Sequence, residues 1–123
     1  MSDYRPDRWC VVSLTTYKLG KNGVKEVSDF HYRVFGCWTG GYLGADHWKL
    51  NSGITSVTQE GDSLLFNGSS GGVYECRKTS YGQTGYGIGV LTNMIERSRA
   101  NDVYIEVLPE DTDFLTLNYG DAT

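Results

Sequence analysis

The sequence contains few of the residues that mark the easily recognised protein classes. Its 123 residues include two prolines, three cysteines and two histidines. The cysteines, at positions 10, 37 and 76, form no CxxC pair and have no histidine at zinc-ligand spacing, so we expect reduced thiols and no metal site. No apolar run approaches the roughly 20 residues that a membrane helix needs, and we therefore expect no membrane insertion.

Catalytic signatures are equally scarce. HExxH, GxSxG, P-loop and paired-carboxylate patterns are all absent. Asp46 and His47 are neighbours, but adjacent residues of a strand point to opposite faces, so they do not form a ready dyad. His31 falls mid-strand in an alternating pattern and is expected on the strand surface. We favour a protein without catalytic activity or cofactor; the alternative is an enzyme of small-molecule or nucleotide metabolism that uses Asp46 and His47.

Charge is modest and unevenly distributed. The net charge is −4, yet residues 1–101 carry eleven basic and nine acidic side chains, and residues 102–123 carry six acids and no base. Such a chain has no broad positive surface, which makes a nucleic-acid partner unfavourable. The length suits one domain. We expect a β-rich domain over residues 1–110 with one helix near 88–100, followed by an acidic C-terminal tail over 111–123.

Glycine and aromatic residues are the abundant components. There are sixteen glycines, nine tyrosines, four phenylalanines and three tryptophans, and thirteen of the glycines lie between positions 36 and 89. Glycine at about 13 % is roughly double its ordinary share of about 7 %. A composition of this kind is typical of a loop-rich β protein.

The patterns along the chain predict mostly strands. Residues 8–18 and 24–36 flank an Asn-Gly turn and predict a long opening hairpin, with Phe30 and Val34 on one face and His31 and Phe35 on the other. Shorter strands are expected around 48–50, 53–59, 63–67, 73–78 and 103–108. A stripe from Val90 to Ile95 predicts the only helix. The expected class is α+β, mostly β: a small curled antiparallel sheet or partly open barrel with one helix near the C-terminus.

Two loops combine aromatic residues with glycine and are our candidates for ligand binding. Large rings on a loop shaped by glycine make a slot that stacks a base or a sugar. The expected contacts are Trp38, Tyr42, Asp46, Trp48, Lys49, Tyr81, Gln83 and Tyr86. The alternative is that the two tryptophans belong to the core and that the glycines form corners of the sheet.

A third glycine motif, Gly85-Tyr86-Gly87-Ile88-Gly89, precedes the predicted helix. Backbone amides at a helix start bind anions, but a dinucleotide fingerprint has GxGxxG spacing directly after a strand. The spacing here is GxGxG, and six residues separate the motif from the preceding strand. We therefore favour glycines that ease a tight loop over a phosphate site.

Three blocks carry a resemblance: YRPDRW near the start, CWTGGYLGADHWKLNSGI, and YECRKTSYGQTGYG. Together they resemble small proteins encoded by tailed bacteriophages, most of which have no assigned function. The resemblance covers roughly residues 4–90 and implies a viral chain expressed in the cytoplasm of an infected bacterium, which agrees with the mixed charge of MSDYRPDRW and its lack of a secretory signal pattern. It supplies no catalytic or binding residues.

The sequence thus leads to a hypothesis of function. We expect a non-enzymatic binding protein of phage type that engages a host protein or a small nucleotide-like ligand through the aromatic-glycine loops. A virion or assembly component is a further alternative. The exposed edges of a short sheet favour pairing, so we expect a monomer or a small homodimer.

Overall fold

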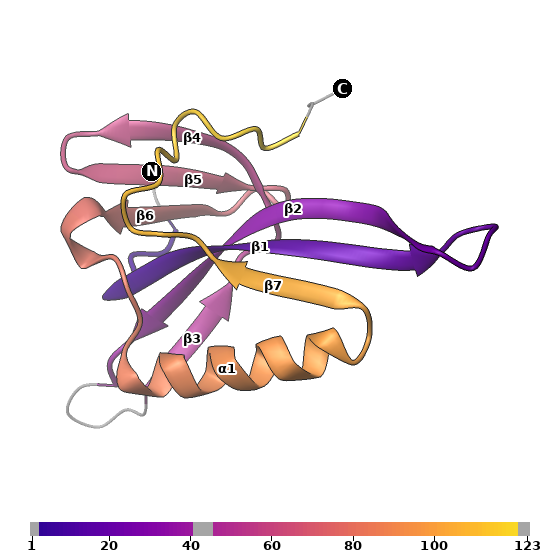
Figure 1. Ribbon diagram of the computed structural model, residues 1–123. Helices are drawn as coiled ribbons and strands as arrows, with labels where there is room; N and C mark the ends of the chain where they lie inside the picture. The colour runs from indigo at the N-terminus through magenta and orange to yellow at the C-terminus, as the bar shows by residue number, and fades with distance from the viewer. Residues whose placement is uncertain (1–2, 41–45, 121–123) are drawn as a thin grey trace.

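The computed structural model, which describes residues 3–40 and 46–120, has three layers (Figure 1). A four-stranded antiparallel sheet lies in the middle, a three-stranded antiparallel sheet covers one face, and the α-helix covers the other. The predicted class, mostly β with one helix near the C-terminus, is confirmed. The strands divide between two sheets, and the described residues form no closed barrel.

The elements follow the predicted order closely. The four-stranded sheet has the order β3 (His47–Leu50), β2 (Lys25–Trp38), β1 (Arg8–Leu19) and β7 (Val103–Val107). The three-stranded sheet has the order β4 (Ile54–Glu60), β5 (Ser63–Gly68) and β6 (Val73–Arg77). A 3-10 turn, η1 (Lys78–Ser80), and the helix α1 (Gly85–Arg99) connect β6 to β7.

β1 is buried on both faces and separates two hydrophobic clusters. Trp9 and Val11 pack toward the three-stranded sheet, in a cluster with Phe66. The intervening Cys10 and Val12 pack in the second cluster with residues of α1. Because side chains alternate along a strand, one apolar run supplies both cores.

The outer edge of β2 is mostly open among the described residues. β3 pairs only with the last part of β2, from Phe35 to Trp38. The remainder of this edge carries polar side chains such as Asp29, His31 and Arg33, and the outer half of the β1–β2 hairpin projects beyond the body (Figure 1). Arg33 therefore lies near the loop at residues 51–53, which connects β3 to β4 of the second sheet.

α1 begins three residues earlier than predicted. The Thr84 side chain caps it, because its Oγ1 accepts a hydrogen bond from the Gly87 amide at 3.0 Å. Gly87 and Leu91 are the buried residues of the helix. Among the described residues, no helix has the length and apolar character needed to cross a membrane.

The chain after β7 packs against the core instead of forming a solvated tail over its whole length. Phe114 is 5 % exposed and lies 5.5 Å from Trp9, centroid to centroid. Leu117 and Tyr119 pack against the same cluster. The acidic residues between Pro109 and Phe114 stay exposed, so the charge count located the acids correctly but overlooked the apolar residues spaced among them.

Two glycines of α1 provide a matched test of this packing. A Cβ on Gly87 would overlap Sγ of Cys37, whereas a Cβ on Gly89 would meet nothing within 4 Å. We expect Gly87→Ala to lower the free energy of unfolding by about 1–3 kcal/mol through overpacking. Gly89→Ala should raise it by about 0.5–1 kcal/mol through helix propensity. Urea denaturation measures both, and equal effects of the two variants would contradict the packing of α1 on Cys37.

Candidate functional site

The residues predicted to bind a ligand do not converge on one slot. β3 separates two of them, since Trp48 points toward α1 while its neighbour Lys49 belongs to the opposite face. Trp48 stacks on Phe35 with centroids 5.6 Å apart and lines a shallow groove beside α1. Tyr42 lies in residues 41–45, outside the described part of the chain.

Tyr81 and Gln83 are structural residues. The Tyr81 hydroxyl donates to the Leu108 carbonyl at 2.6 Å and accepts from the Val11 amide at 3.2 Å, and its ring packs edge-on against Trp9. Burial raises the pKa of this hydroxyl well above its ordinary range. Gln83 Nε2 donates to Sγ of Cys10 at 3.1 Å. Tyr81 therefore ties β1 to the C-terminal segment, and its hydroxyl is fully engaged within the fold.

The glycine motif predicted to precede the helix forms its first turn. The Gly87 amide is already taken by Thr84, and Gly87 itself packs against Cys37. Tyr86 is 43 % exposed on the first turn, on the far side of the sheet from the tyrosines described below. The arrangement fits a tight loop, and nothing in it gathers donors for an anion.

Asp46 and His47 have separate partners. Asp46 Oδ1 accepts from the Gly40 amide at 2.9 Å, and the His47 ring stacks on Trp38 with centroids 5.0 Å apart. The Trp38 indole in turn donates to the Arg5 carbonyl at 3.0 Å. The described residues contain no group of three His, Cys, Asp or Glu that could hold a metal ion. This arrangement gives the enzyme alternative no support.

Four rings instead form a continuous row, which we call the aromatic row: Tyr74, Tyr4, Trp38 and His47. Tyr74 on β6 lies 4.8 Å from Tyr4, and Tyr4 lies 6.5 Å from Trp38, centroid to centroid. Lys49 Nζ lies over the Tyr4 ring, 5.2 Å from its centroid. The row thus runs from β6 in the second sheet to β3 at the edge of the first, and Lys49 places a positive charge beside it.

A cavity of about 300 Å³ opens at the Tyr4–Tyr74 end of this row. We call it the basic cavity; it is lined by Tyr4, Arg33, Lys49, Leu50, Asn51, Ser52, Gly68, Ser70, Gly72 and Tyr74. None of these residues is acidic, and neither cation forms an ion pair with a carboxylate of residues 3–40 or 46–120. Two positive charges at one cavity without a compensating acid favour an anionic guest.

Asn51 lines the basic cavity and has an unpartnered donor that is buried beneath the cavity surface. This residue is 4 % exposed, and its Oδ1 accepts from the amides of Val34 at 2.9 Å and Gly53 at 3.3 Å. These two bonds fix the orientation of the side-chain amide, because a flipped amide would set its own donors against two backbone N–H groups. Nδ2 is buried and has no hydrogen-bond partner among the described residues. A buried donor left unpaired costs about 1–3 kcal/mol.

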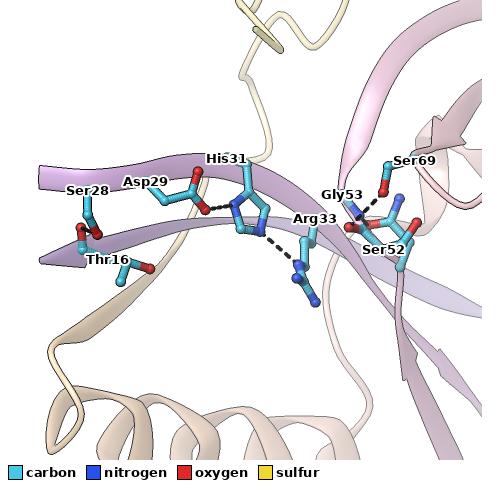
Figure 2. A network of polar contacts seen from close by, with 9 residues as sticks. Thr16, Ser28, Asp29, His31, Arg33, Ser52, Gly53 and Ser69 are labelled. Atoms are coloured by element: carbon cyan, nitrogen blue, oxygen red, sulfur yellow. Dashed lines mark hydrogen bonds and ion pairs between the residues drawn. The ribbon is translucent and has the colours of Figure 1, made fainter.

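Arg33 is held in place by a chain of side chains along β2 (Figure 2). Its Nε donates to His31 Nε2 at 2.9 Å, and His31 Nδ1 lies 2.9 Å from Asp29 Oδ2. Since Nε2 accepts a hydrogen bond, the imidazole proton belongs on Nδ1, where it is donated to the carboxylate. The arrangement fixes the arginine through Nε and leaves the two terminal nitrogens of its guanidinium for other partners.

The opposite wall includes the turn between β5 and β6, which is bonded to Ser52. Ser52 Oγ accepts from the Ser70 amide at 2.9 Å and pairs with the Ser70 hydroxyl at 3.0 Å. Ser69 Oγ donates to the Ser52 carbonyl at 3.1 Å, close to Gly53 (Figure 2). The residues that sequence reasoning missed are Tyr4, Arg33, Asn51, Ser52, Ser70 and Tyr74. Asn51, Ser52 and Ser70 lie in Asn-, Ser- and Gly-rich turns, which are common in loops of every kind, and Tyr4, Arg33 and Tyr74 had no signal of a site.

Tyrosines 81 and 86 distinguish a structural ring from a surface ring. Tyr81→Phe removes a hydroxyl that bonds Val11 and Leu108, and we expect a loss of about 1–3 kcal/mol in the free energy of unfolding. Tyr86→Phe removes an exposed hydroxyl and should leave stability within about 0.5 kcal/mol of the native value. Thermal and urea denaturation measure both; a neutral Tyr81→Phe would return Tyr81 to the candidate ligand contacts.

The three thiols should be unreactive in the folded protein. Burial raises the pKa of Cys10 to about 12, with the Gln83 bond opposing the rise, and burial also raises the pKa of Cys37 and Cys76. An aromatic disulfide reagent at pH 8 should label three thiols in denaturant and none without it. Rapid labelling of the folded chain would contradict this burial.

The same thiols predict a pH dependence of stability. Because their folded-state pKa values lie above the ordinary value of 9.0, the unfolded chain binds fewer protons at high pH, and the free energy of unfolding should fall as the pH rises from about 9 toward 12.

Comparisons with known proteins supply no site that could be carried over. No family model, no curated protein and no solved structure matches this chain. The candidate site therefore stands on the geometry of its own residues: the aromatic row, and the basic cavity at its end.

Proposed function

We propose that this protein binds a small nucleotide-like ligand, with a planar ring against the aromatic row and an anionic group toward the basic cavity. The observation that carries the proposal is the cavity itself, where Arg33, Lys49 and the unpartnered amide of Asn51 line one space of about 300 Å³ with no acid among its walls. Ligand sites are commonly concave spaces of about 300–1,000 Å³ with a few fixed polar groups.

The aromatic row suits the planar part of such a ligand. His47 is exposed at the outer end of the row, and Trp38 behind it is half-buried. Stacking of a base on an aromatic side chain contributes about 1–3 kcal/mol and tolerates different bases. Lys49 joins the row to the cavity, because it lies over Tyr4 and also lines the cavity.

Binding without catalysis fits the chemistry of the site better than an enzyme does. The cavity walls contain no histidine, cysteine or carboxylate, and His31, which contacts the cavity residue Arg33, is engaged by both Asp29 and Arg33. The sequence resemblance supplies the biological setting: we propose a viral binding protein that takes up a host ligand in the cytoplasm of the infected cell.

A host protein is the second candidate partner, and one feature favours it. The projecting β1–β2 hairpin exposes Leu19, Val24, Val27 and Phe30, which are 50–71 % exposed. Exposed apolar groups on a projection are suited to contact with another macromolecule. The small-ligand proposal ranks first because the cavity has donors that the fold itself leaves unpaired.

Calorimetric titration with the four common ribonucleoside monophosphates at low salt tests the small-ligand proposal. We expect binding of at least one of them, with His47→Ala about tenfold weaker because it removes the exposed ring of the row. The control is Tyr86→Ala, an equally exposed ring on α1 that should bind like the native chain. Absence of binding at millimolar concentrations, or equal losses in the two variants, would exclude the aromatic row as the site.

A further inference from the structure

We infer that the basic cavity is a phosphate site that receives the terminal phosphate monoester of the ligand, with Arg33, Lys49 and Asn51 as its donors. This inference deepens the proposed function and rests on it for the identity of the rest of the ligand. It adds the group that the cavity selects, the atoms that contact it and the residue that positions the arginine.

The donor set matches a phosphate better than a neutral group or a carboxylate. A phosphate monoester carries a charge of about −1.5 to −2 and three strong acceptor oxygens. The cavity offers a guanidinium from β2, an ammonium from β3 and an amide from the loop between β3 and β4. Arg33 and Lys49 lie on adjacent strands of one sheet and Asn51 follows β3, so the three donors come from one side of the space, where each can meet a different oxygen of a tetrahedral anion. A planar carboxylate is satisfied by one arginine in a bidentate pair.

Asn51 supplies the most specific element. Its Oδ1 accepts from two backbone amides, so Nδ2 is the part of the side chain left without a partner, and a guest that pairs with it has to enter between the side chains that cover it. A Cβ at position 68 would lie 3.6 Å from this nitrogen and 3.0 Å from Ser52 Oγ, so glycine at this position keeps the space beside the donor open. A phosphate oxygen that accepts a hydrogen bond from Nδ2 would remove the cost of the unpaired donor. A group without an acceptor atom would leave that donor unpaired.

His31 acts as a positioning residue for Arg33. The bond from Arg33 Nε to His31 Nε2 holds the guanidinium without using its terminal nitrogens, and Asp29 holds the imidazole in the accepting tautomer (Figure 2). A pre-oriented arginine loses less conformational entropy when the anion binds. No carboxylate of the described residues lies within ion-pair distance of Arg33, so its charge remains available.

The first experiment compares a nucleoside with its 5′-monophosphate, using whichever base binds best. We expect the monophosphate to bind at least tenfold more tightly, and Arg33→Gln to reduce this ratio at least fivefold. Lys21→Gln, a change of an exposed turn cation, is the charge-matched control and should keep the ratio. Equal affinities of nucleoside and monophosphate for the native chain would overturn the phosphate site and leave ring binding intact.

Inorganic phosphate tests the cavity without any ring. At constant ionic strength, phosphate should shift the side-chain amide resonances of Asn51 in ¹⁵N–¹H spectra, and sodium acetate should not. A phosphate shift without any nucleotide binding would support the site while removing the proposed function. Equal shifts with acetate, or no shift with either anion, would overturn the phosphate inference.

The role of His31 has its own readout. Nitrogen spectra of the imidazole should show the proton on Nδ1, and His31→Leu should lower phosphate affinity at least fivefold. His31→Gln, whose amide oxygen can still accept from Arg33 Nε, should recover part of that loss, while nucleoside affinity stays the same in both variants. A proton on Nε2, or no difference between the leucine and glutamine variants, would overturn the positioning role.

Discussion

The double-sided burial of β1 is the constraint on which the rest of the structure depends. This strand is hydrogen-bonded to β2 on one side and β7 on the other, and its side chains pack alternately toward the three-stranded sheet and toward α1. A strand held on both edges and both faces has no freedom to slip, because a shift of one residue would exchange the two cores. β2 pairs with β1 from Lys25 to Cys37, with one irregularity between Thr16 and Tyr17, and this pairing fixes the positions of Asp29, His31 and Arg33 along the strand.

The parts of the fold that local pattern determines were predictable from the sequence. The opening hairpin, the short strands and the helix follow from alternation, turn residues and a helical stripe, all of which act within a few residues. The division into two sheets was not predictable, since it depends on where the chain leaves β3 after Leu50 and crosses to β4. Phe114 shows the same limit: only the folded chain reveals that an apolar residue among acids reaches Trp9.

The candidate site was only partly accessible to sequence reasoning, for a related reason. Lys49 and Trp38 remain in it because aromatic and cationic residues are conspicuous in any composition. Tyr81 is not part of the candidate site, because its hydroxyl donates to the carbonyl of Leu108, 27 residues along the chain. The sequence alone does not show whether a tyrosine contacts a ligand or makes a buried hydrogen bond of this kind. Asn51 could not be found at all, because an Asn-Ser-Gly turn gives no sign that its amide will be buried against β2.

The basic cavity lies at the junction between the two sheets. Arg33 and Lys49 belong to the four-stranded sheet, while Gly72 and Tyr74 belong to the second sheet or the turn that leads into it. The two like charges and the unpaired donor all lie on the side of the four-stranded sheet, where they raise the energy of the empty cavity. Under the proposed function, a bound anion would compensate these charges and contact both sheets, which also share one hydrophobic cluster. Because the unfolded chain cannot assemble these walls, such binding would also stabilise the packing of one sheet on the other.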